Sequence, residues 1–125
     1  MTPREGRVAT LRLLCAEPMF LCLFTKGPVA GKDECSIQDF TPSKASQMRP
    51  MSMRDWLIDE EKVTAMADKR TFGFSSVGEK ILGWYMILKK DSLVIGYDYF
   101  QDSYKINSTD DKVGARPRLM LGAIK

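Results

Sequence analysis

The 125-residue sequence contains no histidine. Histidine is the usual general base at neutral pH and a common metal ligand, so its absence removes several kinds of active site at once. Excluded are serine and cysteine nucleophiles activated by an imidazole, and every zinc site that includes a histidine ligand. We therefore expect no catalytic activity, no cofactor and no bound metal.

Cysteine is also scarce, and a long apolar run is missing. The three cysteines, Cys15, Cys22 and Cys35, are odd in number and form no C-x-x-C pair. Small secreted domains are usually much richer in cysteine, so we expect an intracellular, cytoplasmic protein. Arg12 and Pro18 interrupt the most apolar stretch near the N-terminus, and for this reason we expect no transmembrane segment.

Neither sign of charge dominates the sequence. Nineteen Lys and Arg residues face 16 Asp and Glu residues, which gives a net charge of +3, and the two signs alternate along most of the chain. Apolar residues make up 44% of the sequence, which is typical of a globular protein and well above the level of disordered chains. The length suits one globular domain over residues 1–125.

Alternating apolar side chains predict strands at the N-terminus and in the second half of the chain. Residues 7–15 place Leu11, Leu13 and Cys15 on one side, as in a half-buried strand. Residues 19–25 are apolar on both faces and predict a buried strand, which would form a hairpin with the first. Further strands are expected at residues 70–74, 80–89, 93–100 and 119–124.

The one expected helix covers about residues 52–69. Ser52 is a suitable N-cap, and Asp55 stands three residues later in the position of a capping box. We therefore predict an α+β single domain with a largely antiparallel sheet of about five to six strands packed against this helix. The side chains expected to face the core from this helix are Met53, Trp56, Leu57, Val63, Met66 and Ala67.

Two segments are expected to be irregular. Residues 26–51 form a long connection punctuated by three prolines, and residues 107–118 form a polar loop. The stretch at 27–33 has the glycines and lysine of a phosphate-binding loop, but it is one residue too short between the glycines and ends in Asp33 instead of a hydroxyl residue. We interpret it as a turn that leaves a strand.

Our main functional hypothesis is a non-catalytic interaction or assembly module that binds another protein or a second copy of itself. The long connection ends in a segment that mixes methionine with arginine, and both residue types are enriched at the centres of protein interfaces. The alternative for the methionines is that they fill gaps in the core. The candidate protein-binding residues are Met48, Arg49, Met51, Met53 and Arg54.

Two further hypotheses remain open. Tyrosines beside basic residues could bind single-stranded RNA, by stacking on bases and contacting phosphates, although several aspartates are interspersed among them. A metal-dependent enzyme could use one of the paired carboxylates, such as Asp110 and Asp111, but none has the spacing of a known calcium loop. The candidate nucleic-acid-binding residues are Tyr97, Tyr99, Tyr104, Lys105, Arg116 and Arg118.

Overall fold

The computed structural model describes residues 3–29 and 35–120 of the chain. It confirms the α+β class with antiparallel sheet, because the described residues form one α-helix, two short 3₁₀ helices and ten strands. In chain order the elements are α1 (Arg4–Cys15), β1 (Met19–Lys26), η1 (Ile37–Asp39), β2 (Thr41–Pro42), β3 (Arg49–Met51), η2 (Met53–Asp55), β4 (Trp56–Asp59), β5 (Thr64–Ala67), β6 (Arg70–Phe72), β7 (Lys80–Leu88), β8 (Val94–Lys105), β9 (Val113–Ala115) and β10 (Arg118–Met120).

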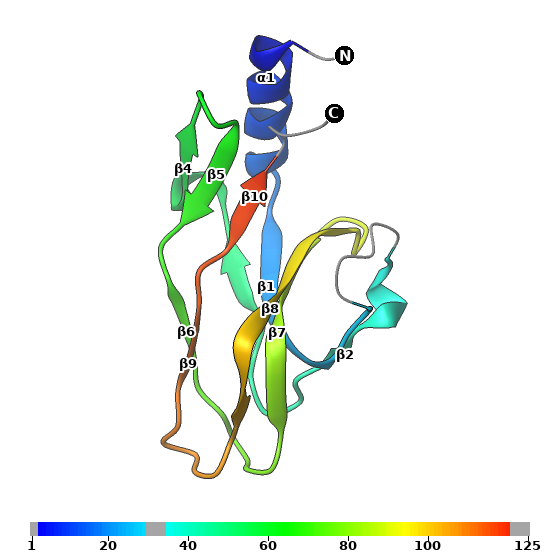
Figure 1. Cartoon of the computed structure of the whole chain (residues 1–125), viewed down its shortest axis with the longest axis vertical. Helices are drawn as coiled ribbons and strands as arrows, with labels where there is room; N and C mark the ends of the chain where they lie inside the picture. The colour runs from blue at the N-terminus through cyan, green and yellow to red at the C-terminus, as the bar shows by residue number, and fades with distance from the viewer. Residues whose placement is uncertain (1–2, 30–34, 121–125) are drawn as a thin grey trace.

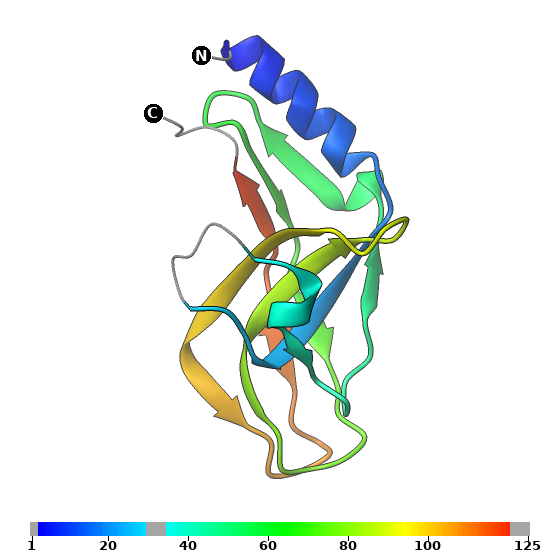
Figure 2. The same cartoon turned by 90° about the vertical axis from the view of Figure 1, so that its right-hand side faces the viewer.

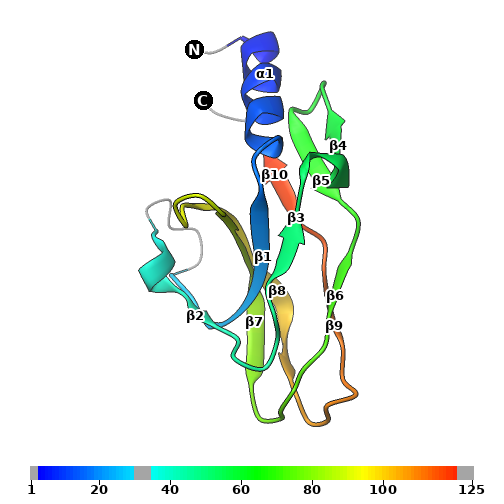
Figure 3. The same cartoon turned by 180° about the vertical axis from the view of Figure 1, so that it is seen from behind.

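A five-stranded antiparallel sheet, here called the central sheet, runs through the middle of the molecule (Figure 1). Its strand order is β2-β1-β7-β8, and β3 also pairs with β1. The view from behind in Figure 3 shows β3 lying along β1. A three-stranded antiparallel sheet of order β10-β5-β4, here called the outer sheet, and a β6–β9 pair complete the strand pairing. Strand β1 therefore has partners along both edges.

The main hydrophobic core lies where the central sheet, the outer sheet and α1 meet. Figure 2 shows α1 lying beside the β4–β5 hairpin at one end of the molecule. The helix contributes side chains at the three- and four-residue spacing of one helical face, and the strands contribute alternate residues. Members of this core include Val8, Leu11 and Cys15 of α1, Leu21 and Leu23 of β1, Ala65 and Ala67 of β5, Trp84 and Met86 of β7, and Leu119 of β10.

The opposite face of the central sheet carries a second, aromatic cluster. Phe24 and Tyr85 lie on neighbouring strands, and the ring of Phe40, just before β2, stacks on that of Tyr85 with 4.4 Å between centroids. The hydroxyl of Tyr99 donates a hydrogen bond to the carbonyl oxygen of Pro28. These contacts attach both described ends of the connection after β1 to the sheet.

The strand expected at residues 7–15, and its hairpin with β1, is wrong: this segment is the helix α1. Val8, Leu11 and Cys15 are buried at helical spacing, whereas Leu13 is 73% exposed. The apolar residues of this segment fit both a two-residue and a three-to-four-residue period, and only packing against the outer sheet selects the second. Strand β1 pairs with β7 instead, with Leu21 opposite Met86.

The main helix expected at 52–69 is also wrong, although its capping signal is real. The carboxylate of Asp55 accepts a hydrogen bond of 2.7 Å from the backbone N–H of Ser52, but this pair starts a single 3₁₀ turn, η2. The chain then forms the β4–β5 hairpin, in whose turn Asp59 Oδ1 accepts hydrogen bonds from the backbone N–H groups of Glu61 and Lys62. Pairing of β5 with both β4 and β10 overrides the helical preference of the segment.

The strands expected at 19–25, 80–89 and 93–100 are confirmed as β1, β7 and β8, and β8 continues to Lys105. The strand expected at 70–74 is present and ends at Phe72. These strands were predictable because β1 and β7 are continuous apolar runs of strand length, and β8 is rich in β-branched and aromatic residues.

The segments expected to be irregular contain short elements. Within 26–51 the structure places η1, β2 and β3, and within 107–118 it places β9 and the first residue of β10. Residues 30–34, in the stretch that shares features with a phosphate-binding loop, lie outside the described residues. The last strand was expected at residues 119–124. Residues 119 and 120 belong to β10, and residues 121–124 lie outside the described residues.

A partly buried carboxylate, that of Glu79, holds the turn after β2 against the start of β7. Glu79 accepts a hydrogen bond of 2.6 Å from Ser43 Oγ, and further ones from the backbone N–H groups of Lys44 at 2.9 Å and Ala45 at 3.2 Å. Burial alone would raise the pKa of Glu79, but these hydrogen bonds and the charge of Lys44 lower it below its ordinary value. The ionised form of Glu79 is therefore part of the fold.

Two leucines of α1 provide a matched test of the helix. Leu11 is fully buried and Leu13 is exposed, so we expect Leu11→Ala to lower the free energy of unfolding by about 2–5 kcal/mol. Leu13→Ala should change it by less than about 0.5 kcal/mol. Urea denaturation followed by circular dichroism measures both. Equal losses would contradict the assignment of α1.

The pKa of Glu79 predicts a specific pH dependence of stability. Because folding lowers this pKa, the contribution of Glu79 is present above the pKa of the unfolded chain and is lost as the pH falls through the folded value. We expect Glu79→Gln to lower the free energy of unfolding by about 1–3 kcal/mol at neutral pH. The variant should also lose less stability than the wild type on acidification. Urea titrations at a series of acidic pH values test this, and parallel curves for the two proteins would contradict it.

Candidate interaction surface

The outer sheet turns one face toward the core and leaves most of the other face exposed, although Thr64 of β5 on that side is only 8% exposed. Side chains alternate along each strand, so Trp56 and Ile58 of β4 pack against the core while Leu57 points away from it. Leu57 is 79% exposed, and Met66 of β5 and Met120 of β10 are also exposed. We call the side carrying Leu57, Asp59, Thr64, Met66, Arg118 and Met120 the outer face.

Strand register places these six residues in two rows. Leu57 pairs with Met66, and Met66 pairs with Arg118 on its other side. In the second row Asp59 pairs with Thr64, and Thr64 with Met120. Directly opposite side chains on one face lie about 4.5–5.5 Å apart and diagonal ones about 7–8 Å apart. Leu57 is therefore a direct neighbour of Met66, and Met120 is a diagonal neighbour of Met66.

A shallow groove of about 800 Å³ runs over the outer face. Its lining includes Leu57, Met66 and Met120, with Glu61 and Lys62 of the hairpin turn at one end. A second hollow begins at the edge of β4, where Met53, Trp56 and Leu57 line it together with Arg12 and Cys15 of α1. The exposed apolar surface is thus continuous from η2 to β10.

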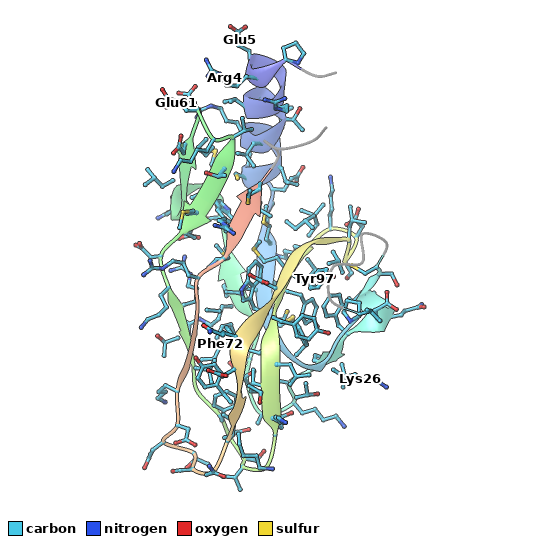
Figure 4. All side chains as sticks on the ribbon, in the orientation of Figure 1. Arg4, Glu5, Lys26, Glu61, Phe72 and Tyr97 are labelled. Atoms are coloured by element: carbon cyan, nitrogen blue, oxygen red, sulfur yellow. The ribbon has the colours of Figure 1, made fainter. Side chains whose placement is uncertain are left out.

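The outer face is held in place by the packing beneath it. Ala65, Ala67 and Leu119 alternate with its residues and are buried in the main core. At the tip of the hairpin, Arg12 Nη2 of α1 lies 3.5 Å from Glu60 Oε2. Figure 4 shows Glu61 at this tip, next to the first turn of α1. The groove therefore lies on regular, packed strands.

The methionines of the candidate protein-binding segment differ in burial. Met51 is only 2% exposed and belongs to the main core, so the hypothesis that it meets a partner is not supported by its position. Met53 is 63% exposed and lies at the β4 edge of the outer face. Met48 and Arg49, before and at the start of β3, are exposed, as is Arg54 in η2.

The candidate nucleic-acid residues do not share one surface. Tyr97 and Tyr99 pack into the aromatic cluster on the second face of the central sheet, and Figure 4 shows Tyr97 in that region. Tyr104 instead packs its ring edge-to-face on Phe100, which contacts the main core. The three basic candidates are exposed, Lys105 at the end of β8, Arg116 between β9 and β10, and Arg118 on the outer face.

Two of the thiols, Cys15 and Cys22, are buried. Burial raises the pKa of Cys15 to about 11, and burial also raises that of Cys22 to about 11 despite a hydrogen bond to Tyr85. Both thiols are therefore protonated at neutral pH. In the part of the chain that the structure describes, no three histidine, cysteine or acidic side chains gather as a potential metal site. Nor does that part contain a helix long and apolar enough to span a membrane.

Comparisons with known proteins leave the geometry as the basis for a functional argument. No protein-family model matches the chain, and searches of curated proteins and of solved structures return no significant match. The function therefore has to be inferred from this chain's own surface.

The sequence patterns did not predict that the residues at the centre of the outer face lie on the surface. Leu57 and Met66 were expected to face the core of a helix, and Met120 was expected in a strand without a functional role. A signal was present: in "WLID" and "RLM" every second residue can lie on the exposed side once strands are assumed. The helical capping pattern at Ser52 outweighed it.

Two methionines only two residues apart should respond differently to truncation. We expect Met51→Ala to lower the free energy of unfolding by about 2–5 kcal/mol, because Met51 is buried in the main core. Met53→Ala should change it by less than about 0.5 kcal/mol. Thermal and urea unfolding measure the difference, and a large loss for Met53→Ala would show that this side chain is not free at the surface.

Proposed function

We propose that this protein is a non-catalytic interaction or assembly module that docks through the outer face of its β10-β5-β4 sheet. The observation that supports the proposal is the group of exposed apolar side chains on one sheet face, Leu57, Met66 and Met120, joined at the edge by Met53. Single exposed apolar residues are common on soluble proteins, but a contiguous patch with a charged rim is typical of a binding site.

The residue types of the outer face suit binding. Methionine side chains are flexible and polarisable, so they adapt to the shape of a partner, and three of the four apolar positions are methionines. Fully burying one such side chain stabilises a complex by about 1.5–3 kcal/mol before the costs of association are subtracted. Asp59 and Arg118 at opposite corners add charges that can orient a partner.

The two alternative functions have less support in the geometry. Binding of single-stranded RNA needs aromatic rings open for stacking beside basic residues, yet Tyr97 and Tyr99 pack against Phe24 and Phe40 of the aromatic cluster. A carboxylate enzyme needs acidic groups that converge. Glu79 and Asp55, whose pKa values are lowered, are instead bound to backbone N–H groups of their own chain. We therefore retain the interaction module as the proposal.

Serine substitutions on the outer face should abolish binding without harming the fold. We expect Leu57→Ser and Met66→Ser, singly and together, to reduce recovery of the binding partner by roughly tenfold or more, because each removes apolar area from the centre of the interface. Affinity purification from the native source, read for protein and for nucleic acid, measures this recovery. Self-association is scored in the same samples by mixing two differently tagged copies.

A matched control comes from the hairpin between β7 and β8. Leu93 lies just before β8 and is exposed, but it lies away from the outer face. Leu93→Ser should bind like the wild type, and each of the three single variants should unfold within about 0.5 kcal/mol of the wild type. Undiminished recovery with the double variant would refute docking through the outer face. Recovery of nucleic acid that weakens with added salt would favour the RNA alternative.

A further inference from the structure

The four corners of the outer face alternate in chemical character. Leu57 and Met120 occupy one diagonal of the register, and Asp59 and Arg118 occupy the other. The apolar diagonal passes beside Met66, and Thr64 fills the remaining middle position. One diagonal is therefore apolar, and the other carries one negative and one positive charge at its two ends.

We propose that the occupant of the outer face is the same face of a second copy of this chain, related by a two-fold axis that follows the apolar diagonal. This inference rests on the proposed function and names the partner. A two-fold axis lying between two facing sheets exchanges the corners on either side of it. Asp59 of one copy would then face Arg118 of the other, and the reverse pair forms by symmetry.

The same rotation brings the apolar side chains together. Leu57 and Met120 lie near the axis, so each packs beside its own symmetry copy, and Met66 crosses to the Thr64 side of the apolar diagonal of the second copy. Glu61, in the hairpin turn next to Asp59, moves toward the Arg118 corner of the second copy as well. Among the six residues of the outer face no like charges are opposed, and the turn that approaches Arg118 brings Asp59 and Glu61 against the single positive charge of Lys62. Packing two copies by any rotation that placed Asp59 on Asp59 would be repulsive.

The charged corners are available for this pairing. The ion pairs between described residues join Arg12 to Glu60, Arg70 to Asp55 and Lys90 to Glu17, and none of them involves Asp59 or Arg118. Asp59 Oδ1 accepts two backbone hydrogen bonds within its own turn, which fixes the direction of the carboxylate without neutralising it. A charge held in this way loses little side-chain entropy when it pairs.

The size of the face predicts a weak, concentration-dependent dimer. Three strands of about four residues cover roughly 10 by 13 Å, which is far below the area of about 800 Å² that each partner contributes to a standard stable interface. We therefore expect association only at high micromolar concentration, unless many copies are held close together. Such an interface suits an assembly in which each contact is weak and repeated.

Charge reversal tests this geometry directly. The full chain is measured by sedimentation equilibrium from about 1 µM to about 1 mM, the range in which weak interfaces associate. We expect a dimer for the wild type and roughly tenfold weaker association for Asp59→Lys and for Arg118→Glu, because each variant opposes like charges at both corners. An equimolar mixture of these two variants should form a heterodimer of wild-type affinity, since both corner pairs are then of opposite charge.

Two controls separate charge from folding. The variant Asp59→Asn keeps an oxygen acceptor for the hairpin turn and removes only the charge, so it should weaken association without lowering the unfolding temperature. Leu93→Ser should associate like the wild type. If either charge-reversal variant were misfolded, mixing it with the other would not restore association. Restored association in the mixture therefore shows that both variants are folded.

The possible failures are distinct. A strict monomer up to the highest concentration overturns the dimer, as does a dimer that the charge reversals leave unchanged, which would indicate pairing through another surface such as the free edge of β4. If the protein is monomeric but Leu57→Ser still abolishes capture of a different partner, only this inference fails. If serine substitution affects neither dimer nor capture, the proposed function fails with it.

Discussion

The pairing of β1 with β7 is the constraint on which the rest of the structure depends. Their six-residue register gives β1 one complete edge, and β2 and β3 use its other edge. Because both faces of these strands are apolar, one face supports the main core and the other supports the aromatic cluster around Phe24 and Tyr85. Burial on both sides makes this pair the part of the molecule least able to tolerate change.

One face of the outer sheet is exposed because α1 covers only the other face. The helix covers the inner side of the β10-β5-β4 sheet, where Val8 and Leu11 join Ala65 and Leu119 in the core. The described residues contain no second α-helix to cover the other side. A three-stranded sheet with one covered face leaves its alternate residues outward, and here those residues are largely apolar. The surface proposed for binding is therefore a direct consequence of the fold.

Sequence patterns predicted the long strands well and the helix badly. Strands β1 and β7 are continuous apolar runs that are buried on both faces, and β8 is rich in β-branched and aromatic residues, so their local pattern and their tertiary environment agree. The segments at 7–15 and 52–69 each fit two periods. In the first, helical spacing competes with alternation, and in the second a true capping pair, Ser52 and Asp55, starts a turn that a hairpin replaces. Short segments of this kind are decided by their neighbours.

The sequence by itself determined the α+β class, the central antiparallel strands and the absence of imidazole chemistry, because composition and long periodic segments carry that information locally. Only the tertiary structure decided which methionines are buried and which are exposed. Met51 and Met53 are two residues apart, but the pairing of β3 with β1 buries the first and the turn of η2 exposes the second. Likewise, Leu57, Met66 and Met120 form one surface only because the β4–β5 hairpin pairs in register with β10, a strand distant in sequence, which no local pattern specifies.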